Sequence, residues 1–202
     1  MSNELTASQQ KMLEDTLFSS DETTYAVVDS ALSNEIHIMI QTGALDYRCL
    51  YEGTEADLLE EAAPYLVQIA QDDDLTNWLF KNVYRKNAIS FIKTETDTEQ
   101  LAYHLRQYAK IQSVVQGDDG KLTKQWVFFA FYDPRVFPRF IKGNTPEQSA
   151  EFFQGINQFI CENAEDKNQL ENYQWVEKDQ KVTRKAINLD EQKNKQEDKN
   201  NG

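Results

Sequence analysis

Three side chains of this 202-residue chain, His104, Asp133 and Arg135, are of the types that could together support hydrolysis or group transfer. A histidine and a carboxylate move protons in such reactions, and an arginine stabilises developing negative charge. The three residues are far apart in the sequence, and no nucleophile motif of the GxSxG kind accompanies them. A scattered hydrolase or transferase site is therefore one hypothesis for the function of the chain.

The sequence lacks the residue spacings that metal and cofactor sites need. The two histidines, His37 and His104, have no HxxxH spacing, and Cys49 and Cys161 form no CxxC pair. Glycine-rich phosphate loops are absent. The segment GDDG at 117–120 resembles part of a calcium loop but lacks its alternating ligands and distal glutamate, so it is expected to be a turn. The favoured expectation is a protein with no catalytic, metal-binding or cofactor-binding residues and no cofactor.

Composition and charge exclude several classes of partner. The net charge is -13, and residues 1–74 hold 16 acidic and 2 basic side chains. This negative charge disfavours binding to nucleic acid. The acidic first third of the chain is either a solvated surface or a docking face for a basic protein segment. No apolar run is long enough for a membrane span, and MSNELTASQQKMLED lacks a signal peptide. The two distant cysteines fit a reducing compartment, so we expect a cytoplasmic protein. From the charge and the lack of a long apolar run, we expect it to bind neither nucleic acid nor membrane.

The elements that would position any site alternate between strands and helices. Helix N-caps are expected at Ser33, within 72–74, within 96–99 and at Thr145, which precedes Pro146. The expected strands are 25–28, 48–51, 65–69, 88–92, 111–115 and 125–132, with the last two joined as a hairpin. This alternation predicts an α/β fold in which a mixed, twisted sheet is flanked by helices.

The C-terminal part is expected to be more helical than the rest. An apolar stripe of Phe152, Phe153, Ile156, Phe159 and Ile160 indicates a helix that follows Thr145. We therefore predict a single α/β domain over residues 1–163 and a polar C-terminal extension over 164–202. Residues 173–176 could form a last strand, and the mixed acidic and basic tail 190–202 is expected to be disordered.

The aromatic stretch FFAFYDPRVFPRFI at 128–141 is interpreted as a structural joint. Residues 126–132 are apolar throughout, which is typical of a central strand buried on both faces. Asp133 then caps a turn, Pro134 occupies a position whose N–H would be unpaired, and Arg135 can pair with Asp133. Gly53 and Pro64 are likewise structural, because Gly53 ends a strand and Pro64 terminates an acidic helix.

The chain is rich in aromatic residues, with 3 Trp, 9 Tyr and 11 Phe. Most of them, including Trp126, fit a hydrophobic core. Tryptophan, tyrosine and arginine also anchor protein interfaces, so an exposed minority could bind a partner. The candidate partner-binding residues are Trp78, Tyr84, Arg85, Arg135, Phe137 and Arg139.

Several segments in succession resemble a known bacterial family. They are YAVVD (25–29), YRCLYEG (47–53), APYLV (63–67), the helix with Trp78, ISFIK (89–93), LAYHLRQY (101–108) and FFAFYDPRVF (128–137). Together they resemble the domain-of-unknown-function 4123 (DUF4123) family of type VI secretion effector chaperones, or adaptors, over about residues 24–160. FYDPRV is the most specific piece of this match.

The resemblance implies a function in protein binding. A member of this family is expected to be a non-enzymatic cytoplasmic protein that binds a secreted toxic effector, through the effector's N-terminal segment, and helps load it onto the VgrG spike protein. The hypothesis of a hydrolase or transferase site near Asp133, Arg135 and His104 is the alternative.

Overall fold

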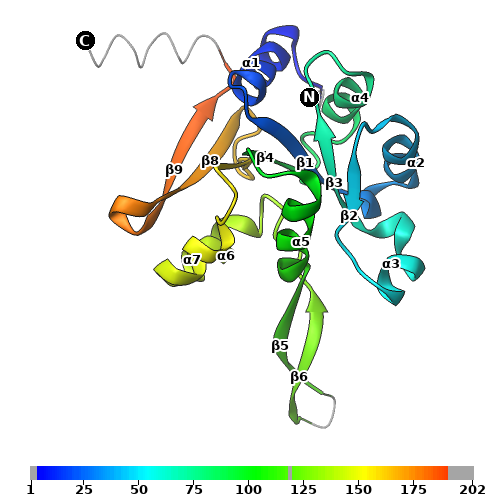
Figure 1. The fold of residues 1–202 in the computed structure, drawn as a ribbon, viewed down its shortest axis with the longest axis vertical. Coiled ribbons are helices and arrows are strands. Elements are labelled where there is room, and N and C mark those ends of the chain that lie inside the picture. Colours follow the sequence, from blue (N-terminus) through cyan, green and yellow to red (C-terminus); the bar gives the residue numbers. More distant parts are fainter. Residues whose placement is uncertain (1–3, 118–119, 191–202) are drawn as a thin grey trace.

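A seven-stranded antiparallel sheet lies at the centre of the protein (Figure 1). The computed structural model describes residues 4–117 and 120–190. Its strands are β1 (Thr23–Asp29), β2 (Tyr47–Cys49), β3 (Pro64–Ile69), β4 (Ile89–Thr94), β7 (Gln158–Glu162), β8 (Gln169–Val176) and β9 (Lys181–Asn188). They are arranged in the order β2-β3-β1-β4-β7-β8-β9, and every neighbouring pair is antiparallel. The α/β class is confirmed, but the described strands form no parallel pair of the kind that a mixed sheet contains.

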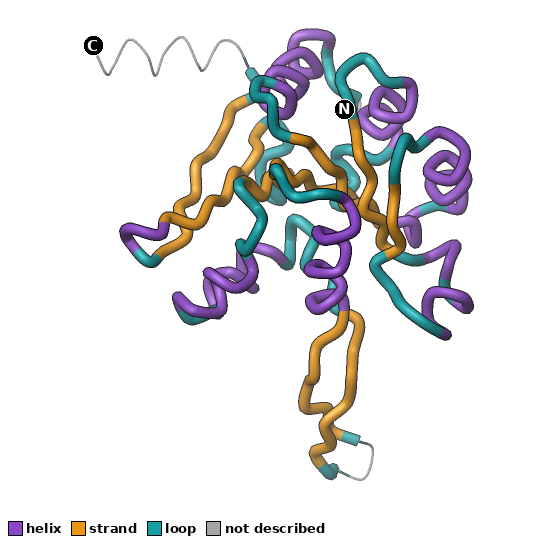
Figure 2. The backbone as a smooth tube through the Cα atoms, viewed as in Figure 1, coloured by secondary structure: helices purple, strands orange, loops and turns teal. Residues whose placement is uncertain are grey.

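Helices cover both faces of this sheet (Figure 2). One hydrophobic core packs α1 (Ala7–Phe18), α2 (Asn34–Gly43) and α4 (Asp74–Asn82) against the first face. The other core packs α5 (Thr98–Ala109), α6 (Phe137–Gly143) and α7 (Pro146–Phe152) against the second. In β1, Ala26 and Val28 contribute to the first core, while Tyr25 and Val27 contribute to the second. This alternation explains why the strand is apolar throughout.

Most of the predicted helix starts are confirmed. Ser33 accepts a hydrogen bond from Glu35 at the start of α2, and Asp73 accepts one from Thr76 at the start of α4. Thr145 forms the expected capping box before α7. In the segment 96–99 the N-cap of α5 is the aspartate at 97 rather than the preceding threonine.

The predictions that Gly53 ends a strand and that Pro64 terminates the acidic helix were wrong, because β2 ends at Cys49 and the helix ends at Leu58. The short helix α3 (Thr54–Leu58) has Gly53 as its N-cap, with a φ of +58° that favours glycine, and a 3-10 turn, Glu60–Ala62, follows it. Pro64 is the buried first residue of β3, so it begins a strand directly after the turn. Gly53 and Pro64 therefore both have structural positions.

The C-terminal part contains strands where a helical part was expected. Helix α7 ends at Phe152, and Phe159 and Ile160 lie in β7, where successive side chains point into opposite cores. The hairpin β8–β9 then extends the sheet beyond residue 163, where a polar extension was predicted. The expected strand at 173–176 is confirmed as part of β8. Of the tail predicted to be disordered, residues 191–202 lie outside the described residues.

A second, two-stranded sheet projects from the body of the protein (Figure 1). It consists of β5 (Lys110–Gln116) and β6 (Leu122–Phe128), which confirms the predicted hairpin. The prediction that residues 126–132 form a central buried strand was wrong, because β6 ends at Phe128 and the side chain of Trp126 is 66% exposed. Of the turn predicted at 117–120, residues 118 and 119 lie outside the described residues.

Candidate partner-binding surface

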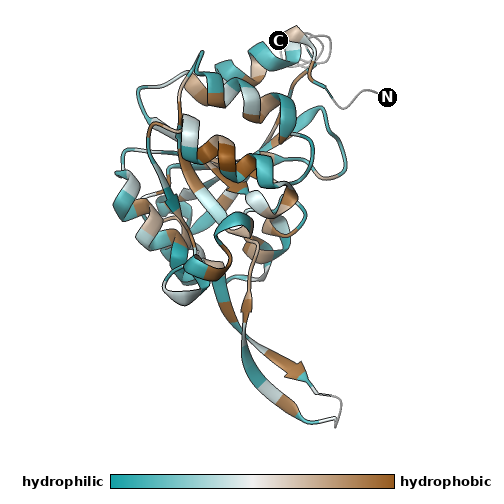
Figure 3. Cartoon of the chain, turned by 90° about the vertical axis from the view of Figure 1, so that its right-hand side faces the viewer, coloured by the Kyte–Doolittle hydropathy of each residue, from teal (hydrophilic) through white to brown (hydrophobic). Residues whose placement is uncertain are grey.

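The β5–β6 hairpin, which projects from the body of the protein in Figure 3, carries exposed apolar side chains on one face. In the antiparallel register Gln112 lies opposite Trp126, Val114 opposite Lys124, and Gln116 opposite Leu122. Directly opposed residues share a face, and so do residues two apart. Val114, Leu122, Trp126 and Phe128 therefore lie on the same face, with exposed fractions of 58%, 70%, 66% and 47%. We call these four residues the apolar hairpin face.

Lysine side chains accompany this apolar face. Lys110 and Lys124 belong to the same face of the hairpin by register. The ammonium of Lys110 lies 5.3 Å from the centre of the Phe128 ring and pairs with the carboxylate of Glu55. A cation placed over an aromatic ring is attracted by the ring's negative face. The hairpin face is thus apolar with a basic margin, in a protein whose first third is acidic.

A small hollow of about 220 Å³ lies where the hairpin joins the body. Its wall includes Leu50, Tyr51, Arg106 and Phe128. The rings of Tyr51 and Phe128 are 4.5 Å apart, so the apolar hairpin face continues into this hollow. Burial, with smaller effects of Asp29 and Cys49, raises the pKa of Tyr51 to about 12, and the phenol is therefore neutral at physiological pH.

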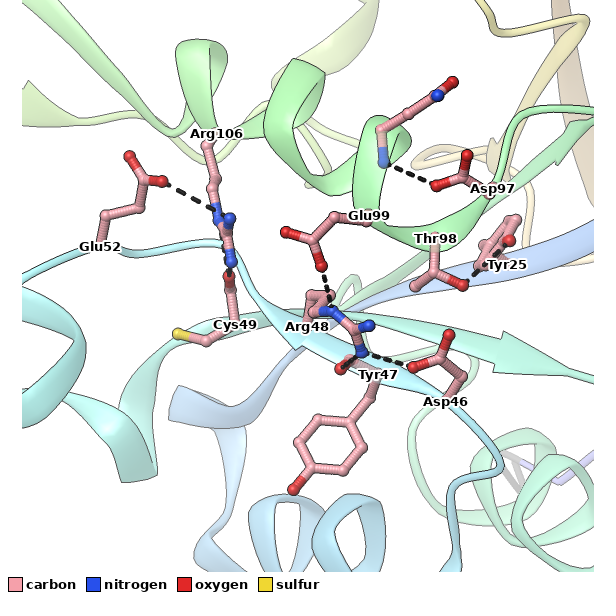
Figure 4. Close-up of polar contacts among 11 residues, drawn as sticks. Tyr25, Asp46, Tyr47, Arg48, Cys49, Glu52, Asp97, Thr98, Glu99 and Arg106 are labelled. Carbon is pink, nitrogen blue, oxygen red and sulfur yellow. Dashed lines mark hydrogen bonds and ion pairs between the residues drawn. The ribbon is translucent and has the colours of Figure 1, made fainter.

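Two arginines attach α5, which leads directly into β5, to the edge strand β2 (Figure 4). Arg106 donates two hydrogen bonds, of 3.1 and 2.9 Å, to the carbonyl oxygen of Cys49. Arg48 donates to the carbonyl oxygen of Tyr47 at 2.7 Å and to the Glu99 carboxylate at 2.7 Å. These contacts fix the root of the hairpin, and they occupy carbonyl groups at a sheet edge that could otherwise pair with another strand.

The predicted partner-binding residues do not form one surface. Tyr84, Arg85 and Phe137 are buried, which corrects the expectation that they are available to a partner. Trp78 is half-buried and packs against the first core. Only Arg135 and Arg139 are exposed, and both lie beside a hollow of about 510 Å³.

The three buried candidates have structural roles. The guanidinium of Arg85 donates to the Glu4 carbonyl at 2.9 Å, to Gln9 at 3.2 Å and to Asn168 at 3.0 Å, which ties the N-terminal segment to the loop before β8. Phe137 stacks on Phe159 with ring centres 3.8 Å apart. Tyr84 belongs to the first core.

The joint at 133–138 is organised by Asp133, as the sequence predicts. Its buried carboxylate accepts a hydrogen bond from the backbone N–H of Arg135 at 2.8 Å, and the Arg135 guanidinium donates to both of its oxygens. The Asp133 carbonyl accepts the N–H groups of Val136 and Phe137, after which α6 begins with a proline in its first turn. Pro134 is buried beside this turn.

The residues of the alternative catalytic hypothesis are only partly brought together. Asp133 and Arg135 form an ion pair, with 2.6 Å between Oδ2 and Nη2. His104, in contrast, uses Nε2 to contact the carbonyl oxygen of Phe152 at 2.8 Å and packs against Tyr108. In the ranges 4–117 and 120–190, no group of three or more His, Cys, Asp or Glu side chains could hold a metal ion.

The apolar hairpin face was missed by reasoning from the sequence. The sequence pattern predicts a core position for Trp126, because an uninterrupted apolar run resembles a buried strand. The alternation of Leu122, Lys124 and Trp126 with Thr123 and Gln125 contains a signal, since the first three share one side of a strand. Local sequence does not show whether another element covers that side.

Comparison with known proteins gives one match. A family model described as "Domain of unknown function (DUF4123)" matches residues 24–151, while no curated protein and no solved structure matches the chain. Across the described residues, no helix combines the length and apolar character needed to cross a membrane. The matched region runs from β1 through α7, includes the projecting hairpin and covers more than half of the sequence. The chain therefore belongs to the DUF4123 family.

Proposed function

We propose that this chain is a cytoplasmic type VI secretion effector chaperone, or adaptor, which binds a toxic effector and helps load it onto the VgrG spike protein. Membership of the DUF4123 family supports the proposal together with the FYDPRV segment, on which the resemblance to the adaptors depends. The observation that carries the binding role is the apolar hairpin face, which is exposed to solvent on a hairpin that projects from the body in Figure 3.

We assign the apolar hairpin face to an apolar segment of the effector, near the effector's N-terminus. Fully burying one large apolar side chain contributes about 1.5 to 3 kcal/mol, and aromatic residues at the centre of an interface commonly contribute most of its binding energy. Trp126 and Phe128 are therefore the expected anchors. The effector and the spike protein bind at separate surfaces in this proposal.

We further propose that the protein acts without catalysis. The Asp133 carboxylate is engaged by Arg135 and by a backbone N–H, and His104 contacts a backbone carbonyl, so each group has a structural partner. A hydrolase or transferase would instead need these groups to face one substrate. A turnover that disappears in a folded Asp133→Asn variant would favour the enzyme.

Co-purification tests the proposed function. The tagged chain should retain the VgrG spike protein or the effector encoded by an adjacent gene, each identified by mass spectrometry, at near-physiological salt. If the wild-type protein retains neither of them, the adaptor proposal fails.

Variants of the hairpin test the surface separately. Trp126→Ala and Phe128→Ala should each weaken effector binding by about tenfold or more, which corresponds to about 1.4 kcal/mol. Tyr103→Ala is the matched control, because Tyr103 is an equally exposed aromatic residue, at 66%, on α5. Equal retention by the wild-type protein and both hairpin variants would refute this surface while leaving the adaptor function intact.

A further inference from the structure

Lys93 is an almost fully buried cation with an incomplete set of partners. It lies in β4, and only 2% of its surface is exposed. Its Nζ atom is 3.9 Å from the nearest carboxylate oxygen, on Glu22, which is beyond hydrogen-bond distance. Among residues 4–117 and 120–190, Glu22 is its ion-pair partner. Lys93 also lines a polar hollow, so its N–H donors can be satisfied by whatever occupies that hollow.

A row of polar side chains crosses the sheet beside Lys93. Gln158 of β7 lies directly opposite Lys93, and its Oε1 accepts a hydrogen bond of 2.7 Å from Nδ2 of Asn172 on β8. Lys185 of β9 lies directly opposite Asn172. Oδ1 of Asn172 is buried and has no hydrogen-bond partner in the described part of the chain. Two cations therefore flank a pair of amides, one of which has an unused acceptor.

This row forms the floor of a hollow of about 620 Å³ between the sheet and the end of α1. Thr16 and Ser19 contribute the α1 side of its wall. Among the described residues, the side chains that line the hollow include two lysines and no carboxylate. The Glu22 carboxylate, 3.9 Å from Nζ of Lys93, offsets part of the charge of that lysine, and salt screens carboxylates beyond about 8 Å, so Lys185 adds positive charge to the hollow that no carboxylate among the described lining residues balances.

We propose that this hollow binds a small oxyanion that also carries a hydroxyl group, such as hydrogen phosphate or a hydroxycarboxylate. The oxyanion accepts hydrogen bonds from Nζ of Lys93, and its hydroxyl group donates to Oδ1 of Asn172. Lys185 contributes a second positive charge from the outer side. Water can satisfy single N–H groups, and Glu22 offsets part of the Lys93 charge, whereas a bound oxyanion does both for Lys93 and Lys185 together. This site is separate from the apolar hairpin face and does not depend on the proposed adaptor function.

The test uses inorganic phosphate and citrate as probes of the isolated full-length chain. Isothermal titration calorimetry, at ionic strength matched with sodium chloride, should show saturable binding of at least one probe by the wild-type protein. Lys93→Met, which keeps a similar side-chain volume, should weaken that binding by at least tenfold. Lys124→Met is the matched control, because it removes the same charge from the exposed hairpin and should leave the affinity unchanged.

A second variant keeps the test decisive if Lys93→Met does not fold. Asn172→Asp places a carboxylate in the hollow and should exclude the anion, again weakening binding by at least tenfold. Absence of saturable binding of both probes to the wild-type protein would overturn the proposal. Equal affinity in the wild-type protein and in a folded Lys93→Met or Asn172→Asp variant would also overturn it.

Discussion

The buried carboxyl group of Glu162 should make the stability of this protein depend on pH. Glu162 ends β7 and is only 4% exposed, and its Oε1 accepts a hydrogen bond of 2.8 Å from the backbone N–H of Arg85. Burial raises the pKa of Glu162 from 4.5 to about 7, although the backbone N–H groups of Arg85 and Asn87 act in the opposite direction. The neutral form of the carboxyl group is therefore favoured in the folded protein.

The sign and size of the effect follow from proton linkage. Between pH 4.5 and about pH 7 the folded protein retains a proton that the unfolded chain has released. The stability contributed by this proton is fully present below pH 4.5 and is lost as the pH rises through 7. At about 1.4 kcal/mol for each pKa unit, the free energy of unfolding should fall by about 3 kcal/mol across this range.

Urea denaturation of the wild-type protein and of Glu162→Gln, at several values between about pH 5 and pH 8, measures this contribution. The free energy of unfolding of the wild-type protein should fall with rising pH by about 2 to 3 kcal/mol more than that of the variant. Glu165→Gln is the matched control, because Glu165 is an exposed glutamate in the following loop, and its pH dependence should follow the wild type. Parallel pH profiles for the wild type and Glu162→Gln would refute the reasoning.

Three further substitutions test the structural roles of residues that were first considered for binding or catalysis, each by urea denaturation. Arg85→Ala should lower the free energy of unfolding by about 2 to 4 kcal/mol, because it removes several charged hydrogen bonds. The control Arg139→Ala, at an exposed position, should change it by less than about 0.5 kcal/mol, and equal losses in the two variants would contradict a structural role for Arg85. Phe137→Ala should cost about 3 to 5 kcal/mol by opening a cavity in the second core, and a cost below that of the half-exposed Phe128→Ala would contradict its placement there. Asp133→Ala should cost about 0.5 to 2 kcal/mol through loss of the turn cap, and an unchanged stability would exclude that role.

Much of the local structure could be predicted from the sequence because its causes are local. The caps at Ser33, Asp73 and Thr145 depend on a side chain that reaches a backbone N–H two or three residues away. The contact between Asp133 and Arg135 spans only two residues. β1 is recognisable because both of its faces are buried and its side chains are correspondingly apolar.

The candidate site could not be predicted in the same way. Trp126 and Phe137 are both aromatic residues in apolar surroundings, yet one is largely exposed and the other is fully buried. The difference arises because α7 and β7 pack against Phe137, whereas no described element covers the outer part of the hairpin face. Which surfaces meet depends on contacts between segments far apart in the chain, and these are not encoded in a local pattern.

The sequence by itself determined the alternation of strands and helices, the positions of the caps, and the segments by which the family is recognised. The tertiary structure decided that β8 and β9 complete the sheet, that β5 and β6 leave it, and that Lys93 lies beneath a hollow lined with amides. The physical reason is the separation along the chain of the residues that interact. Hydrogen bonds within a turn act between neighbours in the chain, whereas burial and charge environment depend on which distant segments pack together.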